Sequence, residues 1–152
     1  MDKLLDPANE FNSAVKFLAR VYALKKKGTF EEEKALRNNK RLAIVIASDP
    51  IWMIEICGPF FLKYAKIIQE RNWDAFLEHD FSEEKERYKK SEDGVKHTYD
   101  AMDGKIQFIK RAFLDSDENE RKALGDAVQT LLSSYCTYAL QVKKNEEEKN
   151  KG

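Results

Sequence analysis

The amino-acid sequence predicts an all-α fold, a single-domain bundle of five or six helices that closes with a C-terminal antiparallel helical hairpin. Two stretches near the C-terminus repeat apolar residues at alternating steps of four and three, which is the spacing of one helix face and not of a strand. Charged residues make up 36% of the 152 residues, as is typical of helices with solvated outer faces. The two apolar stripes are Val95, Tyr99, Met102, Ile106, Ile109, Phe113 and Leu124, Val128, Leu131, Tyr135, Tyr138, Val142.

The first helix is predicted to begin at Asp6 and Pro7 and to end at Gly28. An aspartate side chain can accept hydrogen bonds from the unpaired amides of a helix start, and proline suits the first helical position. The three lysines before Gly28 suit the negative end of the helix dipole, and glycine favours the left-handed cap. The buried face is expected to comprise Phe11, Ala14, Val15, Leu18 and Tyr22.

The second helix is predicted to open at Thr29, with Glu32 three residues later completing a capping box. Glutamates 31–33 suit the positive end of this helix. The helix finishes in six consecutive apolar residues, 42–47. Because this last part is apolar on every side, we expect it to be buried.

The third segment starts with the same signal, Asp49 and Pro50, and is mostly apolar through Ile68. The Gly58-Pro59 pair inside it predicts a kink or two consecutive helices, because proline cannot donate its amide and crowds the preceding turn. Three charged residues also interrupt the segment, so we expect a buried core helix and not a transmembrane span. A cluster of three aromatic residues and one leucine then predicts a short helix or turn whose aromatic side packs on the core. Its members are Trp73, Phe76, Leu77 and Phe81.

The hairpin is predicted to pair residues 83–114 with residues 118–143. Asp117 followed by Glu120 can form a reciprocal capping box on its second helix. Residues 144–152 are almost wholly charged or polar and are expected to be disordered. The domain is therefore predicted to span residues 1–143.

No assembled catalytic set is recognisable, so we expect no enzymatic activity and no cofactor or metal. The chain lacks a glycine-rich phosphate loop and the common hydrolase and zinc motifs. Its two histidines, His79 and His97, lack the glutamate that a dimetal bundle site would place three residues earlier. Cys57 and Cys136 both lie in apolar helical patterns, which favours a reducing, intracellular setting.

Charge is distributed unevenly along a chain whose net charge is zero. Nine basic residues face three acidic ones between Lys16 and Arg41, so the rest of the chain carries the opposite excess. A local basic face of this kind can bind phosphates, contact the acidic part of another copy, or be a solvated helix face with lysines matched to the dipole. The binding candidates are Lys25, Lys26, Lys27, Lys34, Arg37, Lys40 and Arg41.

Several large aromatic side chains within residues 52–81 are expected to lie mostly in the core, with some left at the surface as anchors for a partner protein. The anchor candidates are Trp52, Trp73, Phe76 and Phe81. The sequence thus favours a helical interaction or structural protein that binds a protein partner or itself. The first alternative is a nucleic-acid-binding accessory protein that uses the basic N-terminal helices. The second is an enzyme with an unrecognised site around His79 or His97. A membrane partner is not expected.

Residues 49–81 carry a pattern of their own. It consists of Asp49-Pro50, Gly58-Pro59-Phe60, Lys63-Tyr64, Ile67, Arg71-Asn72-Trp73-Asp74-Ala75-Phe76-Leu77 and Asp80-Phe81. This pattern resembles small, uncharacterised helical proteins of large double-stranded DNA viruses that infect eukaryotes. The resemblance implies an intracellular viral protein, packaged in the particle or working in the virus factory of the host cell. It implies no catalytic residues.

Overall fold

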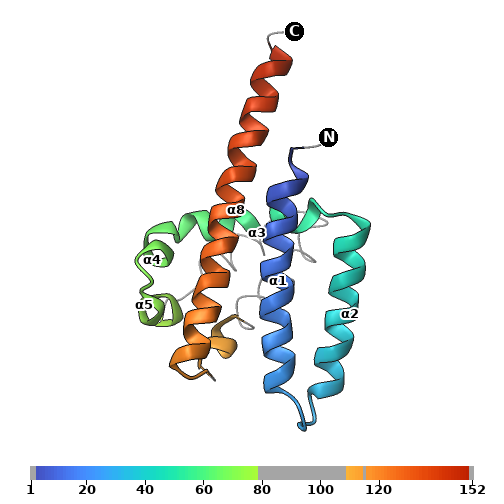
Figure 1. Ribbon diagram of the computed structural model, residues 1–152, viewed down its shortest axis with the longest axis vertical. Coiled ribbons are helices and arrows are strands. Elements are labelled where there is room, and N and C mark those ends of the chain that lie inside the picture. The colour runs from blue at the N-terminus through green and yellow to red at the C-terminus, as the bar shows by residue number, and fades with distance from the viewer. Residues whose placement is uncertain (1–2, 79–108, 115, 151–152) are drawn as a thin grey trace, which may run out of the picture.

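The computed structural model describes residues 3–78, 109–114 and 116–150, and every regular element in these ranges is an α-helix (Figure 1). The all-α prediction is therefore confirmed. A short helical segment also covers residues 109–114. The other described elements are α1 (Leu5–Lys25), α2 (Glu32–Ser48), α3 (Trp52–Lys63), α4 (Ala65–Gln69), α5 (Trp73–Glu78) and α8 (Glu118–Asn150).

The long helices α1 and α8 run antiparallel and form the centre of the molecule (Figure 1). An ion pair of 2.5 Å between Lys25 Nζ and Glu120 Oε2 joins the end of α1 to the start of α8. The apolar stripe predicted for the last helix faces inward, with Leu124, Val128 and Leu131 fully buried. The prediction of this helix and of its buried face is confirmed.

Helix α3 contributes apolar side chains to the core and packs against both α8 and α1. Met53, Ile54 and Phe61 are buried there. The predicted alternative of two helices that meet at Gly58-Pro59 is wrong, because α3 continues through Pro59 to Lys63. The next residue, Tyr64, has φ of −105° and ψ of 21°, which are not helical. The other alternative, a kink at this pair, stays a prediction. Pro59 is exposed, so the carbonyl that its missing amide leaves unpaired, that of the exposed Glu55, can bond to water.

Gly58 lies at the contact between α3 and α8. A Cβ atom at this position would overlap the ring of Tyr135. The absent side chain therefore allows the two helices to approach closely. Tyr138, on the same side of α8, donates a hydrogen bond of 2.9 Å from its hydroxyl to Glu55 Oε1.

The predicted short helix of aromatic residues is found as α5. Phe76 is buried and its ring packs edge-on against Tyr64 and Trp73, with centroids 6.5 and 6.4 Å away. Arg71 adopts a left-handed conformation, with φ of 55°, between α4 and α5. Its guanidinium donates to Asp126 Oδ1 at 2.9 Å and to Gln129 Oε1 at 2.6 Å, which ties this corner to α8.

Two of the predicted helix starts differ from the structure in detail. Helix α1 begins at Leu5, without a side-chain cap, and Pro7 lies within its first turn. Helix α2 begins at Glu32, whose carboxylate accepts a 2.9 Å hydrogen bond from the amide of Gly28 and not from that of Thr29. Turn geometry, which depends on residues on both sides of the cap, causes these shifts of a few residues.

One of the two bonds of the predicted capping box is found at the start of α8. Asp117 Oδ1 accepts a hydrogen bond of 2.8 Å from the amide of Glu120. This bond to the backbone, followed by one to the Glu120 side chain, lowers the pKa of Asp117 from its ordinary value. The Glu120 carboxylate also forms the ion pair with Lys25, so the cap joins the two central helices.

The C-terminal end differs from the expectation of disorder after residue 143. Helix α8 continues to Asn150, and residues 144–150 are helical and largely exposed. Polarity alone does not end a helix, and lysine and glutamate are good helix formers. Gln141 Nε2 also donates to Asn145 Oδ1 at 2.8 Å across this boundary. Of the first hairpin helix predicted over 83–114, residues 83–108 lie outside the described part of the chain.

Candidate functional site

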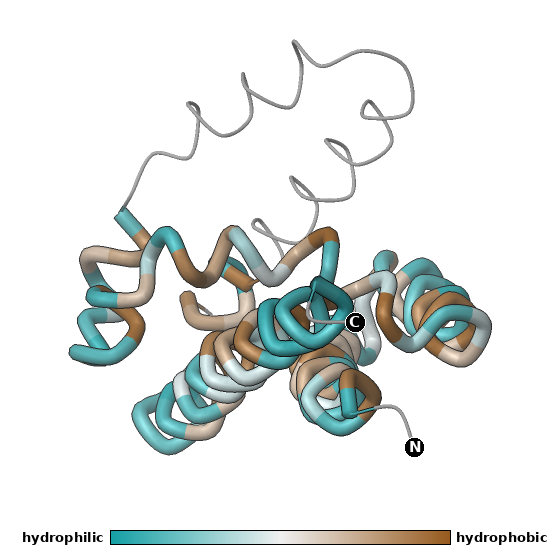
Figure 2. Tube along the Cα trace, turned by 90° about the horizontal axis from the view of Figure 1, so that it is seen from above, coloured by the Kyte–Doolittle hydropathy of each residue, from teal (hydrophilic) through white to brown (hydrophobic). Residues whose placement is uncertain are grey.

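Helix α2 lies at the edge of the molecule and packs chiefly on α1 (Figure 2). Its inner side buries Ala35 and Ile46. Asn39 Nδ2 donates a hydrogen bond of 3.2 Å to the carbonyl of Ala19, which fixes α2 to the neighbouring helix. Because α1 covers only one side of α2, the opposite side faces solvent.

The exposed side of α2 carries an apolar stripe, and the prediction that residues 42–47 are buried all round is wrong. Leu36 is 48% exposed and Ile44 is 65% exposed. Residues at i, i+7, i+8 and i+11 share one helix face, and the exposed Lys40, four positions from both Leu36 and Ile44, lies on that face between them. Burial fails here because a single neighbouring helix can cover only one face. The α2 stripe consists of Leu36, Ala43, Ile44 and Ala47.

Basic side chains accompany the stripe. Arg37, Lys40 and Arg41 are exposed on the outer half of α2, and Lys27 and Lys34 are exposed nearer the turn that joins α1 to α2. Basic side chains therefore lie within and beside the apolar stripe, and the acidic Glu33 lies one turn before Leu36.

The remaining two predicted basic residues are engaged within the protein. Lys25 Nζ pairs with Glu120 Oε2, and Lys26 Nζ lies 3.1 Å from Glu31 Oε2 and 5.4 Å from the ring centre of Tyr22. The hydrogen bond to Glu31 raises the pKa of Lys26 and lowers that of Glu31. Lys25 and Lys26 therefore contact acidic residues of the same chain, and the other five binding candidates, Lys27, Lys34, Arg37, Lys40 and Arg41, are exposed.

The predicted aromatic anchors lie mostly against the core. Trp52 and Trp73 are half-buried and pack on it. Phe76 is 2% exposed, so its prediction as a surface anchor is wrong: it fills the space between Tyr64 and Trp73. Phe81 lies outside the described residues.

Sequence reasoning missed the most exposed aromatic residue of the described chain. Phe30 is 97% exposed in the turn between α1 and α2. Leu24, at the end of α1, is also exposed. The signal was present, because Phe30 stands among polar residues between two helices and continues the apolar period of neither.

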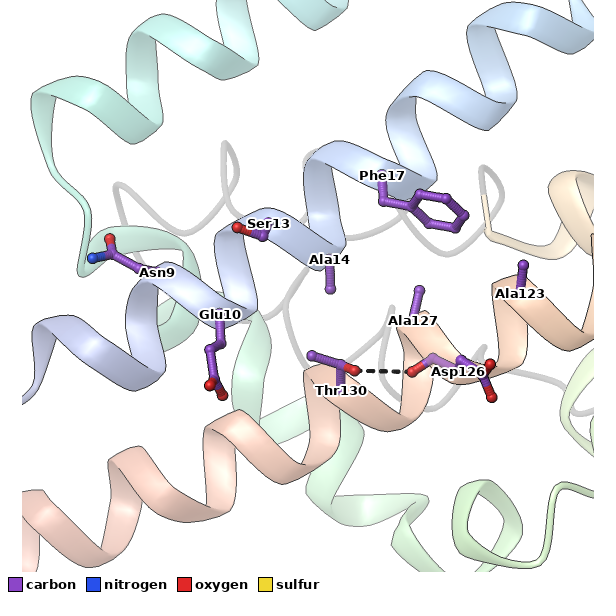
Figure 3. A pocket seen from close by; sticks show the side chains of 9 residues that line it. All are labelled: Asn9, Glu10, Ser13, Ala14, Phe17, Ala123, Asp126, Ala127 and Thr130. Atoms are coloured by element: carbon purple, nitrogen blue, oxygen red, sulfur yellow. Dashed lines mark hydrogen bonds between the residues drawn. The ribbon is translucent and has the colours of Figure 1, made fainter.

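An open groove of about 700 Å³ runs between α1 and α8 (Figure 3). Small side chains at Ala14 and Ala127 form its floor, and half-buried Phe17 closes one end. Glu10 and Asp126 are the charged residues that line it. The other lining residues are Asn9, Ser13, Ala123 and Thr130.

Metal ligands do not gather in the described ranges, where no three His, Cys, Asp or Glu residues lie close enough to hold an ion. His79 and His97 are outside these ranges. Among the described helices, none is long and apolar enough to span a membrane alone. Helices α2 and α3 together meet the length and composition test, but their axes differ in direction by 106°.

Comparison with known proteins leaves the fold and the surface as the available guides to function. No protein-family model matches the chain, and neither a curated protein nor a solved structure is significantly similar to it. The viral resemblance of residues 49–81 stays a prediction.

Proposed function

We propose that the protein is a non-enzymatic helical interaction protein that binds a protein surface through the outer face of α2. The observation that carries this proposal is the exposed α2 stripe. Single exposed apolar residues are common on proteins, whereas a group of exposed apolar residues among polar ones on one helix face is typical of an interaction site. The stripe has this form, because Lys40 lies between Leu36 and Ile44, and Arg37 and Arg41 border them.

The expected mode of binding is a helix seated in a groove, with apolar residues at helical spacing as anchors. Leu36 and Ile44 would supply most of the affinity, since fully burying such a side chain contributes about 1.5–3 kcal/mol. The arginines and the lysine would raise the association rate and select an acidic partner surface.

Site-specific photocrosslinking tests this proposal. A photoreactive amino acid replaces Ile44 in the full chain, and the chain is irradiated in the cells that express it. Leu140, on α8, provides the matched control because it is 61% exposed and also apolar. Protein adducts are expected from position 44 well above those from position 140. Equal yields at the two positions would refute the proposal.

A second candidate is binding of nucleic acid by the basic side chains. It is favoured by the exposure of Lys34, Arg37, Lys40 and Arg41 within two turns of one helix. Such binding would weaken steeply with salt, because each neutralised phosphate releases counterions. The triple variant Lys34→Glu, Arg37→Glu, Arg41→Glu should then abolish binding of a short DNA duplex at low salt. Retained DNA affinity in this variant would exclude the candidate.

The viral resemblance bears on where such a partner would be sought. If the chain is a component of a virus particle or virus factory, the partner is another protein of that assembly. The crosslinking experiment in infected cells covers this case.

A further inference from the structure

We infer that the partner of the α2 stripe is a second copy of this chain, and that the stripe binds in the open groove between α1 and α8 of that copy. This inference rests on the proposed function and specifies its partner. It joins the two features of the described surface that have no counterpart within the same bundle: an apolar helix face and a groove with a floor of small residues.

The two surfaces agree in size. The stripe runs from Leu36 to Ala47, about 16 Å along the helix axis at 1.5 Å per residue. The groove is lined by α1 from Asn9 to Phe17, about 12 Å of helix. Alanines at the floor allow a third helix to approach closely, as small residues do where helices pack. Leu36 and Ile44 would project into the groove.

The two surfaces also agree in charge. Both charged residues that line the groove, Glu10 and Asp126, are acidic, although Asp126 is partly neutralised by Arg71 at 2.9 Å. Three of the charged side chains beside the stripe, Arg37, Lys40 and Arg41, are basic, and the acidic Glu33 lies one turn before Leu36. Opposite charges at the border of an apolar contact favour encounter and fix register.

The contact must join two copies. In each copy α1 lies between α8 and α2, and the bond from Asn39 to Ala19 holds α2 against α1 (Figures 1 and 2). The stripe therefore cannot reach the groove of its own chain. Because the stripe and the groove are different surfaces, the contact is heterologous, and each copy offers one surface to each of two neighbours. Such contacts build chains or closed rings.

Two blocked variants test this geometry. Ala123→Arg places a long basic side chain in the groove at an exposed position of α8 and leaves the stripe intact. Leu36→Asn with Ile44→Asn removes the anchors and leaves the groove intact. Ser133→Arg is the control, because Ser133 is exposed on α8 and does not line the groove. Circular dichroism verifies that each variant keeps its helical content.

Sedimentation velocity over a concentration series gives the readout. The wild type and Ser133→Arg should increase in mass with concentration. Each blocked variant alone should stay monomeric, with association at least about tenfold weaker, since losing about 1.4 kcal/mol of apolar burial has that effect. An equimolar mixture of the two blocked variants should form dimers and nothing larger, because only one stripe and one groove remain functional.

Three results would overturn the inference: a wild type that stays monomeric throughout, a blocked variant that still associates, or a mixture that does not form dimers. A monomeric wild type that still crosslinks through position 44 to another protein would refute self-association and leave the proposed function standing. Loss of crosslinking would refute both.

Discussion

Helices α2 and α3 contain similar apolar runs in opposite surroundings. Ile44, in the run of α2, is 65% exposed, whereas Ile54, in the run of α3, is fully buried. Helix α3 packs against α8, α1 and α4, but α2 packs chiefly against α1. An apolar run therefore sets how much apolar surface a helix can bury. The number of neighbouring helices decides how much of that surface is buried.

The largest expected effect on stability is at Ile54, the buried isoleucine of α3. Ile54→Ala should lower the free energy of unfolding by about 2–5 kcal/mol, because it removes a side chain from the packed core and leaves a cavity. Urea denaturation followed by circular dichroism measures the change. A loss below about 0.5 kcal/mol, the size typical of surface substitutions, would show that α3 is not held in the core.

A substitution at Gly58 tests how closely α3 approaches α8. Gly58→Ala should destabilise the protein by about 1–3 kcal/mol, since the new methyl group would overlap the ring of Tyr135. Adding Tyr135→Ala should make the double variant less unstable than the sum of the two single losses, because the overlap is then removed. Simple additivity in denaturation experiments would contradict this contact.

The third prediction concerns Asp117, which caps the start of α8, the helix on which α3 packs. The pKa of Asp117 is lowered in the folded state, so its stabilising effect is complete above its unfolded pKa and is lost as the pH falls through the folded value. Asp117→Asn keeps a capping side chain without the charge. The melting temperature of the wild type should therefore exceed that of the variant by a few degrees at neutral pH. This difference should begin to shrink as the pH falls below about 4, and it should disappear once the pH is below the folded pKa of Asp117.

The smallest effect is expected on the outer face of α2. Ile44→Asn should change the free energy of unfolding by no more than about 0.5 kcal/mol, because the side chain has few neighbours in the monomer. Denaturation is measured at low protein concentration, where self-association is negligible. Ile46→Asn is the matched control, two positions away and buried against α1, and should be clearly more destabilising. A loss of stability for Ile44→Asn as large as that for Ile46→Asn would show that both side chains are buried.

Local signals in the sequence identified the helices but not their surroundings. The cap at Asp117 and the inward face of α8 were predicted correctly, because both depend on residues a few positions apart. Pro59 does not divide α3 into two helices, since the cost of a proline inside a helix depends on whether the carbonyl that it leaves unpaired reaches solvent. The end of α8 at residue 143 was also misjudged, because the last residues lack a core but still favour the helix.

At the candidate site, too, the sequence identified residues but not their neighbours. The exposed basic residues could be listed from the sequence, but not the pairing of Lys25 with Glu120, which is 95 positions away. The burial of Phe76 and the exposure of Ile44 likewise depend on which helices are adjacent. Neither the groove nor the α2 stripe is visible until α1 is placed between α2 and α8.

The length of α8 has a practical consequence for how the protein can be attached to a surface. At 33 residues this helix is about 50 Å long, and its last turns extend past the start of α1 (Figure 1). The start of α1 and the end of α8 therefore lie at the same end of the molecule, and the turn between α1 and α2, which carries Phe30, lies at the other (Figure 1). A sensor chip or bead coupled at the C-terminus would hold the bundle away from the support by the projecting turns and leave α2 accessible to an analyte.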